Sequence, residues 1–192
     1  GAEHKLRRAL ELLEYKDSDA WFTLGLVLSE QGLHREEECI DAYRQSLALN
    51  DEDAELLYNL AIKIGDRHRR IGCDGIAEEM KLYARCTELD PTFGGAWLNL
   101  GTSLAEQGNL VDAEIMFRKV AALVGTDANG QSSSRTCSNR EVIPKAYVNL
   151  ALIYHQRATD ALHRRDMEAA KTLSLETIKH LDRAKPMLSS LD

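Results

Sequence analysis

The sequence lacks most of the features that mark catalytic, metal-binding or membrane proteins. Its four cysteines form no CxxC pair, which argues against a zinc framework and fits reduced thiols in a cytoplasmic or nuclear protein. No run approaches the roughly 18 apolar residues of a membrane span. Nucleophile elbows, phosphate-binding glycine loops and metal-ligand constellations are missing too. We therefore expect no enzymatic activity, no cofactor, no bound metal and no membrane span.

Prolines and aromatic residues are also scarce. Three prolines and 6% aromatic residues, in a chain of 192 residues that is 44% hydrophobic, do not suit a sandwich or barrel of short strands. The long stretches rich in Ala, Leu, Glu, Lys and Arg favour helices instead. We therefore predict an all-α protein with almost no sheet and with enough apolar residues for a substantial core.

Cationic side chains are not in excess. The 24 Lys and Arg residues against 31 Asp and Glu give a formal net charge of -7, whereas nucleic-acid binding draws its affinity from clustered cations. One basic cluster, residues 67–70, is interpreted as a solvated turn between helices, because no aromatic stacking platform accompanies it. We expect a protein or peptide partner and no nucleic acid.

The sequence does contain an internal repeat. Four segments share a bulky residue, a Leu three positions later, a small residue next, and another bulky residue three positions beyond that. They read AWFTLGLVL (20–28), ELLYNLAIKI (55–64), AWLNLGTSL (96–104) and AYVNLALIY (146–154). This spacing places the large residues on one face of a helix. A second helical stretch follows each segment, so each copy predicts a helix hairpin that must stack on its neighbours.

The third copy, AWLNLGTSLAEQGNLVDAEIMFRKVAAL, resembles the tetratricopeptide repeat nearly throughout, and the preceding Asp90 and Pro91 add to the likeness. The resemblance implies a right-handed α-solenoid of stacked antiparallel hairpins over about residues 17–183. The shared leucines are 36, 40 and 50 residues apart, against a family period of about 34. We therefore expect extra residues in the turns, among them GDRHRRIGCDG in the second copy and the stretch 157–165 in the fourth.

The repeat pattern predicts one domain over residues 1–192. Its expected parts are a leading half-repeat (4–16), repeat 1 (17–50), repeat 2 (51–91), repeat 3 (92–123), a flexible insertion (124–143), repeat 4 (144–183) and a tail (184–192). The insertion is rich in Gly, Ser and Asn and is the expected first site of proteolysis. The last helix is expected to act as a cap and to break at Pro186. Trp21 and Trp97 are expected to pack between hairpins.

In repeats of this kind the first helix of each hairpin lines a concave groove, and the residue before each shared Leu faces it. Those residues are Thr23, Asn59, Asn99 and Asn149. An amide donates and accepts at once, so a row of asparagines matches the backbone of a bound peptide. The row is similar to the asparagine ladder in the repeats of O-linked N-acetylglucosamine transferases, which implies peptide binding. The alternative is that these amides only satisfy local hydrogen bonds.

Apolar residues flank this row and are expected to line the same groove. They are Phe22, Leu26, Tyr58, Ile62, Leu98, Thr102, Val148 and Leu152, with Thr102 the polar exception. An apolar groove suits the side chains of an extended segment or the apolar stripe of an amphipathic helix. The alternative is an internal filler, either the insertion 124–143 or the tail around Met187, Leu188 and Leu191.

Farther along the same helices, acidic residues recur in phase. Glu30, Asp66 and Glu106 are expected to form one acidic edge of the groove, with Gln156 in the fourth place. Such an edge favours a partner that bears Lys or Arg. The lysine and asparagine clamp with which co-chaperones of this family grip a C-terminal carboxylate is missing, because Phe22 and Leu26 and their counterparts occupy those places.

The sequence therefore predicts a protein-interaction scaffold with a peptide-binding groove. A second hypothesis is that the chain is the substrate-recruiting repeat region of a larger enzyme, such as a glycosyltransferase. The leading half-repeat supports that reading, because it suggests an array that continues upstream. A chaperone adaptor is a weaker hypothesis, since the carboxylate clamp is absent.

Overall fold

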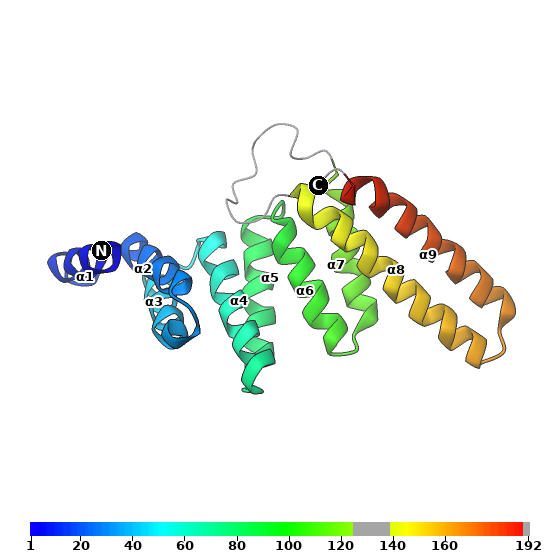
Figure 1. The fold of residues 1–192 in the computed structure, drawn as a ribbon, viewed down its shortest axis with the longest axis horizontal. Helices are drawn as coiled ribbons and strands as arrows, with labels where there is room; N and C mark the ends of the chain where they lie inside the picture. The colour runs from blue at the N-terminus through cyan, green and yellow to red at the C-terminus, as the bar shows by residue number, and fades with distance from the viewer. Residues whose placement is uncertain (125–138, 190–192) are drawn as a thin grey trace. The chain divides into compact units, whose positions relative to one another are not determined.

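A computed structural model describes residues 1–124 and 139–189 of the chain (Figure 1). Within these ranges all regular structure is helical, so the predicted all-α class is confirmed. The helices are α1 (Ala2–Leu12), α2 (Ser18–Glu30), η1 (Leu33–Arg35), α3 (Glu36–Leu49), α4 (Ala54–Ile71), α5 (Ile76–Leu89), α6 (Gly94–Glu106), α7 (Leu110–Ala122), α8 (Asn139–His163) and α9 (Met167–Leu188).

The chain divides into two compact units, Gly1–Asp90 and Pro91–Asp192. In the first unit α1 packs on α2, α2 and α3 form one hairpin, and α4 and α5 form a second. In the second unit α6 pairs with α7 and α8 pairs with α9, while α8 also contacts α6 and α7. Each unit thus contains two of the four predicted hairpins. The assignment of residues 1–192 to a single domain stays a prediction.

Short polar side chains begin several of the helices, and a glycine ends the longest helix of the first unit. Asp17, Asp53 and Asp166 each accept a hydrogen bond from a backbone N–H in the first turn of the helix that follows. Gly72 ends α4 in the left-handed conformation, with φ of 69°. A residue with a side chain is disfavoured there, which explains why glycine follows this long helix.

The small residue after the shared Leu has a packing role. A Cβ atom on Gly25 would lie 2.4 Å from the ring of Tyr43, and one on Gly101 would lie 2.7 Å from the ring of Phe117. Both rings belong to the second helix of the same hairpin and are 1% and 2% exposed. Glycine therefore allows the two helices to approach until the aromatic ring rests on the backbone.

The two tryptophans pack less deeply than expected. Both rings are only partly buried. The indole N–H of Trp21 donates to the carbonyl of Tyr15, and that of Trp97 donates to the carbonyl of Pro91, at 3.1 and 3.0 Å. Each tryptophan therefore ties the start of its hairpin to the segment just before it.

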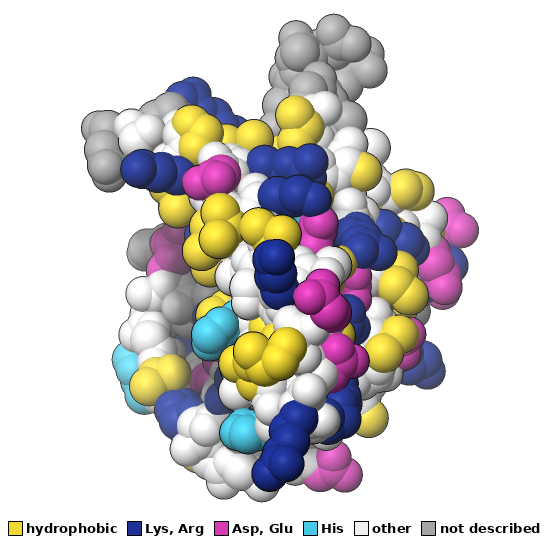
Figure 2. Space-filling view, turned by 90° about the vertical axis from the view of Figure 1, so that its right-hand side faces the viewer, with side chains coloured by type: hydrophobic (Ala, Val, Ile, Leu, Met, Phe, Trp, Pro, Cys, Tyr) yellow, Lys and Arg dark blue, Asp and Glu magenta, His cyan; other side chains and the backbone are white. Residues whose placement is uncertain are grey.

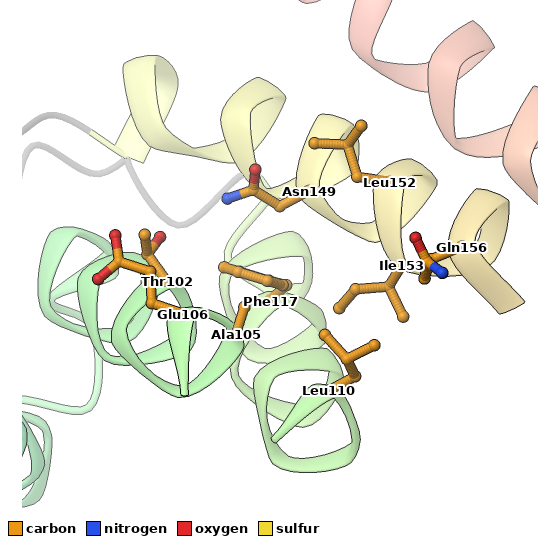
Figure 3. Close-up of a pocket in the computed structure, with 9 residues that line it drawn as sticks. All are labelled: Thr102, Ala105, Glu106, Leu110, Phe117, Asn149, Leu152, Ile153 and Gln156. Carbon is orange, nitrogen blue, oxygen red and sulfur yellow. The ribbon is translucent and has the colours of Figure 1, made fainter. Parts of the chain in front are cut away.

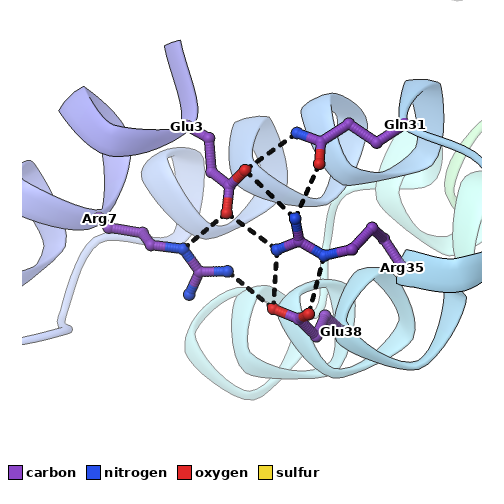
Figure 4. A network of polar contacts seen from close by, with 5 residues as sticks. All are labelled: Glu3, Arg7, Gln31, Arg35 and Glu38. Carbon is purple, nitrogen blue, oxygen red and sulfur yellow. Dashed lines mark hydrogen bonds and ion pairs between the residues drawn. The ribbon is translucent and has the colours of Figure 1, made fainter. Parts of the chain in front are cut away.

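The leading helix α1 is attached to the first hairpin by a network of charged side chains (Figure 4). Arg35 pairs with Glu3 at 2.9 Å and with Glu38 at 2.8 Å, and Arg7 bridges the same two carboxylates. The hydrogen bonds from Arg35, Gln31 and Arg7 lower the pKa of Glu3 to about 2. Because Arg7 and Glu38 are 45% and 51% exposed and the other members are only half-buried, the network orients α1 more than it stabilises it.

The predicted turn GDRHRRIGCDG is wrong, since most of it continues α4. This helix runs to Ile71, and the basic cluster 67–70 forms its last turns. Arg67 pairs with Glu37 at 2.6 Å, Arg69 with Glu79 at 3.1 Å, and Arg70 with Glu36. Glu36 and Glu37 begin α3 and Glu79 lies on α5, so the added turns are held by ion pairs with both neighbouring helices.

The boundaries predicted around the fourth hairpin also need correction. Residues 139–143 of the predicted insertion already belong to α8, because Val142 and Ile143 are buried and Asn139 bonds the start of α6. The predicted turn 157–165 is helical through His163. Pro186 lies inside α9, which ends at Leu188. Residues 125–138, which include most of the expected proteolytic site, and Leu191 lie outside the described residues.

A buried polar cluster joins α7 to α8. Glu114 on α7 is 7% exposed. It accepts a hydrogen bond from the Tyr154 hydroxyl at 2.6 Å and pairs with Arg157 at 2.5 Å and with Arg118 at 2.6 Å. Burial raises the pKa of Glu114, but these hydrogen bonds and positive charges outweigh it, so the pKa lies below the ordinary value of 4.5.

A buried histidine joins α9 to α8. His180 is 8% exposed and stacks on Tyr154 and Tyr147, with ring centroids 5.3 and 6.0 Å away. Its Nδ1 atom has no hydrogen-bond partner among the described residues. Burial and the charges of Arg183 and Arg118 lower its pKa below 6.5, against the opposing charges of Glu176 and Glu114. His180 therefore belongs to the core as a neutral ring.

This histidine should make the second unit sensitive to mild acid. Its pKa is lower in the folded state, so the unfolded chain binds the proton first and stability falls as the pH drops below 6.5, the ordinary value. We expect a loss of up to about 1 kcal/mol between pH 7.5 and 5.5. Urea unfolding at both pH values, followed by Trp97 fluorescence in a Trp21→Phe background, measures it. A His180→Phe variant that keeps the full pH dependence would contradict this assignment.

Candidate functional site

The predicted groove residues lie on the first helices of the four hairpins. Phe22, Thr23, Leu26, Tyr58, Asn59 and Ile62 lie in the first unit, and Leu98, Asn99, Thr102, Val148, Asn149 and Leu152 lie in the second. Their exposure varies widely. Tyr58 and Leu98 are 7% and 8% exposed, so little of either is open to a partner, whereas Leu152 is 60% exposed.

In the second unit, several of these residues meet at one cavity of about 370 Å³ (Figure 3). It lies among α6, α7 and α8 and is lined by Thr102, Ala105, Glu106, Leu110, Phe117, Asn149, Leu152, Ile153 and Gln156. Apolar side chains make most of its wall, and a few polar groups lie among them. This composition, together with the volume, is typical of sites that receive a small ligand or an anchoring side chain.

The cavity unites two patterns seen in the sequence. Thr102, Asn149 and Leu152 come from the predicted groove, and Glu106 and Gln156 come from the row of acidic and amide residues. They converge because α6 and α8 are the first helices of successive hairpins and contact each other. The remaining lining residues belong to the packing positions, and no motif distinguishes them as lining a cavity.

The asparagines of the predicted row differ in what they bond. The Asn59 amide donates to the carbonyl of Glu55, four residues earlier on its own helix, at 2.8 Å. Asn149 makes no hydrogen bond to the described residues, and in Figure 3 its amide reaches toward the gap between α8 and α6. Of these two, Asn149 is therefore the amide with donors and an acceptor available to a ligand.

The first unit has a different hollow, which the sequence did not indicate. A cavity of about 560 Å³ lies among α3, α4 and α5. It is lined by Leu47, Asp51, Leu57, Glu78, Lys81, Leu82, Ala84, Arg85 and Glu88, none of which belongs to the predicted groove. Most of the charged side chains that line it already have ion-pair partners within the unit, because Glu78 pairs with Arg44 and Arg85 pairs with Glu88. Glu30 and Asp66 are exposed in this unit and line neither cavity.

Two of the three cysteines in the described residues are placed for packing, and the third, Cys73, is half-buried. Cys39 and Cys86 are buried, and each donates a weak hydrogen bond to a backbone carbonyl, of Gly25 and Ala54 respectively. Burial raises the pKa of Cys39 and raises that of Cys86 to about 12, so both remain thiols at neutral pH. Cys137 lies outside the described residues.

The described parts of the chain contain neither a metal-ligand cluster nor a helix able to cross a membrane. No group of three or more His, Cys, Asp or Glu side chains there is arranged to hold a metal ion. His68 and Cys73, which the sequence places close together, meet only through the His68 ring and the Cys73 backbone carbonyl. None of the helices in residues 1–124 and 139–189 combines the length and the apolar character that crossing a membrane requires.

Comparison with known proteins supports the repeat assignment. Residues 82–115 match the tetratricopeptide repeat family. This segment runs from α5 through α6 into α7, and so includes residues 96–115 of the copy at 96–123 that resembles the family most closely in sequence. The match supports the protein-interaction scaffold that the sequence predicts. No curated protein matches the chain by sequence.

Solved structures share the fold at low sequence identity. A crystal structure of MamA is 16% identical, with a TM-score of 0.69, and the alignment covers 99% of this chain and 88% of MamA. A second crystal structure of MamA protein is 18% identical, with a TM-score of 0.67, and covers 97% of this chain and 81% of the other. These likenesses confirm the helical-hairpin fold.

Proposed function

We propose that this chain is a protein-interaction scaffold that anchors a partner segment in the cavity among α6, α7 and α8. The observation that carries the proposal is the convergence of Thr102, Asn149 and Leu152 on that cavity. The match of residues 82–115 to a protein-interaction repeat supports it independently. Asn99 and Val148, which the groove prediction also includes, extend this binding surface within the second unit.

The cavity has the chemistry to hold one apolar side chain of a peptide. Phe117, Ile153 and Leu110 provide an apolar wall, and Leu152 stands exposed at the mouth. Burying an apolar side chain there contributes about 1.5–3 kcal/mol. The free amide of Asn149 then lies within reach of the peptide backbone beside that side chain, where a hydrogen bond adds about 0.5–1.5 kcal/mol.

The polar side chains at the cavity indicate what lies beside the apolar anchor of the partner. Glu106 is an exposed carboxylate at the same cavity, and Gln156 adds a neutral amide from α8. A Lys or Arg close to the apolar anchor of the partner would lie near Glu106. We therefore assign a short segment with an apolar anchor and a neighbouring basic residue as the partner.

Binding without catalysis is part of the proposal. The buried Cys39 and Cys86 thiols remain protonated, so neither is a ready nucleophile. The buried carboxylate of Glu114 already pairs with Arg118 and Arg157. Nucleic acid is not the partner that we propose. The three arginines of the basic cluster 67–70 already pair with carboxylates of this chain, those of Glu37, Glu79 and Glu36. A scaffold of this kind also serves as the substrate-recruiting region of a larger enzyme, and that second role uses the same cavity.

Phage display of random peptides on the wild-type protein, followed by affinity measurements on the selected peptides, tests the proposal. Leu152→Asp should weaken them about tenfold to 100-fold, because it places a charge at the apolar mouth. Asn149→Ala should weaken them about twofold to tenfold. Val111→Asp is the matched control, since Val111 is 64% exposed on α7 and does not line the cavity.

The outcomes separate the site from the rest of the surface. Peptides that bind Leu152→Asp as well as wild type would place recognition elsewhere, and an equal loss in Val111→Asp would show a general effect of the added charge. Selected peptides are expected to be enriched in Lys or Arg beside an apolar residue, and Glu106→Gln should reduce that preference. A selection without basic residues would remove Glu106 from the site.

A further inference from the structure

The outer face of α9 carries large apolar residues that no described helix covers. The opposite face packs on α8, where Ala170, His180 and Ala184 are buried. On the outer face Leu175 and Ile178 are 53% and 52% exposed. Figure 2, which looks onto this end of the second unit, shows hydrophobic patches alternating with acidic and basic ones.

Four charged residues continue the same face on both sides of Leu175 and Ile178. They are Glu168, Lys171, Asp182 and Lys185, all exposed. At about 100° of rotation per residue, these four and the two apolar residues fall within an arc of about 100° around the helix. None of the four has an ion-pair partner among the described residues, whereas Glu176 and Lys179 on the flank pair with each other at 2.5 Å.

The order of these residues is symmetric about the point between Glu176 and Thr177. Glu168 and Lys185 lie equally far from that point, as do Lys171 and Asp182, and as do Leu175 and Ile178. Each symmetric pair combines either opposite charges or two apolar side chains. A surface with this property is self-complementary under a twofold axis.

We propose that a second copy of this chain docks its α9 antiparallel on this face and forms a twofold symmetric dimer. Glu168 then faces Lys185 of the partner subunit, Lys171 faces the partner's Asp182, and Leu175 faces the partner's Ile178. Because the axis repeats every contact, the interface holds four ion pairs around two apolar contacts. A parallel arrangement would instead place Lys171 against the partner's Lys171.

The size of the contact sets the strength of the dimer. A helix of 22 residues is about 33 Å long, so a single helix pair gives an interface at the small end of stable assemblies. The dimer should therefore exchange with monomer and respond to concentration. It should also weaken at high salt, because its charged pairs are exposed at the rim.

Charge reversal and charge exchange test the register. We expect sedimentation equilibrium of the full chain, from about 1 to about 500 µM, to show a rise from the 21.5-kDa monomer to twice that mass. Lys171→Glu places a glutamate opposite the partner's Asp182, and the twofold axis repeats this repulsive contact once more. The change should therefore raise the dissociation constant of the dimer about tenfold or more. The double variant Lys171→Glu/Asp182→Lys restores opposite charges and should return the constant to within about threefold of wild type.

Lys81→Glu, the same change at an exposed lysine on α5, is the matched control and should leave the constant unchanged. Helical circular dichroism of each variant checks that it folds. A wild-type chain that stays monomeric throughout would overturn the proposal and leave the α9 face to a different partner helix. A dimer that survives Lys171→Glu would place the interface elsewhere. A double variant that stays as weak as the single one would overturn the antiparallel register.

Discussion

Replacing Phe117 with alanine is expected to lower the free energy of unfolding of the second unit by about 3–5 kcal/mol. The ring is 2% exposed, rests against the backbone at Gly101 and walls the cavity between α6 and α8. Removing it loses the buried apolar surface and also leaves a void. That void joins the existing cavity of about 370 Å³, so the neighbouring helices gain little by closing on it.

The two tryptophans allow this loss to be measured in one unit at a time, because Trp21 lies in the first unit and Trp97 in the second. In a Trp21→Phe background, urea unfolding followed by fluorescence reports on the second unit alone. Ile115→Ala on the same helix, at a residue that is 44% exposed, should cost less than about 1 kcal/mol. An equally small loss for Phe117→Ala would show that the ring does not anchor the hairpin.

The part of the fold that was predictable from the sequence is the part encoded locally. The shared Leu, the small residue after it and a later aromatic residue recur in one chain segment, and they specify a hairpin in which Phe117 or Tyr43 rests on a glycine. The second and fourth hairpins carry Ala61 and Ala151 in place of the glycine, so what all four copies share is the helical spacing of large and small residues. The all-α class and the positions of the hairpins follow from that spacing.

Helix ends were not predictable in the same way, because contacts with other helices determine them. Residues 67–70 look like a polar turn, yet they are helical because Glu36, Glu37 and Glu79 on α3 and α5 pair with their arginines. Pro186 was expected to break α9. It lies so close to the end of the helix that losing one backbone hydrogen bond there is tolerated.

The candidate site was predictable only in outline. Sequence position assigned the same role to Asn59 and Asn149, but Asn59 bonds its own helix and Asn149 reaches toward a cavity. The difference comes from the neighbouring helices, since the hollow beside Asn149 exists only where α6, α7 and α8 leave a gap. Periodicity places a residue on a helix face, but the shape of that face depends on packing between helices.

The cavity depends on how firmly α8 is held against α7, and the Glu114 cluster supplies a polar part of that attachment. Glu114 connects Arg118 on its own helix with Tyr154 and Arg157 on α8. Tyr154 in turn stacks on His180 of α9. This chain of contacts links three helices of the second unit, so a change at Glu114 should reach beyond a single ion pair.

Glu114→Ala is therefore expected to destabilise the second unit by about 2–4 kcal/mol at pH 7.5. The change removes the charge that balances Arg157, whose side chain is 30% exposed, and it leaves the Tyr154 hydroxyl without its acceptor. Glu176→Ala, which breaks the exposed pair with Lys179, is the control and should cost less than about 1 kcal/mol. Both losses are measured by urea unfolding with Trp97 fluorescence.

Two further measurements distinguish charge balance from simple loss of packing. Because the folded pKa of Glu114 lies below 4.5, its contribution is present above that pH and is lost as the pH falls through the folded value. The gap between wild type and Glu114→Ala should therefore narrow in acid. The double variant Glu114→Leu/Arg157→Leu removes both charges and should be more stable than Glu114→Leu alone. A double variant that is less stable than that single one would mean that Arg157 stabilises α8 through packing and not as the counter-charge of Glu114.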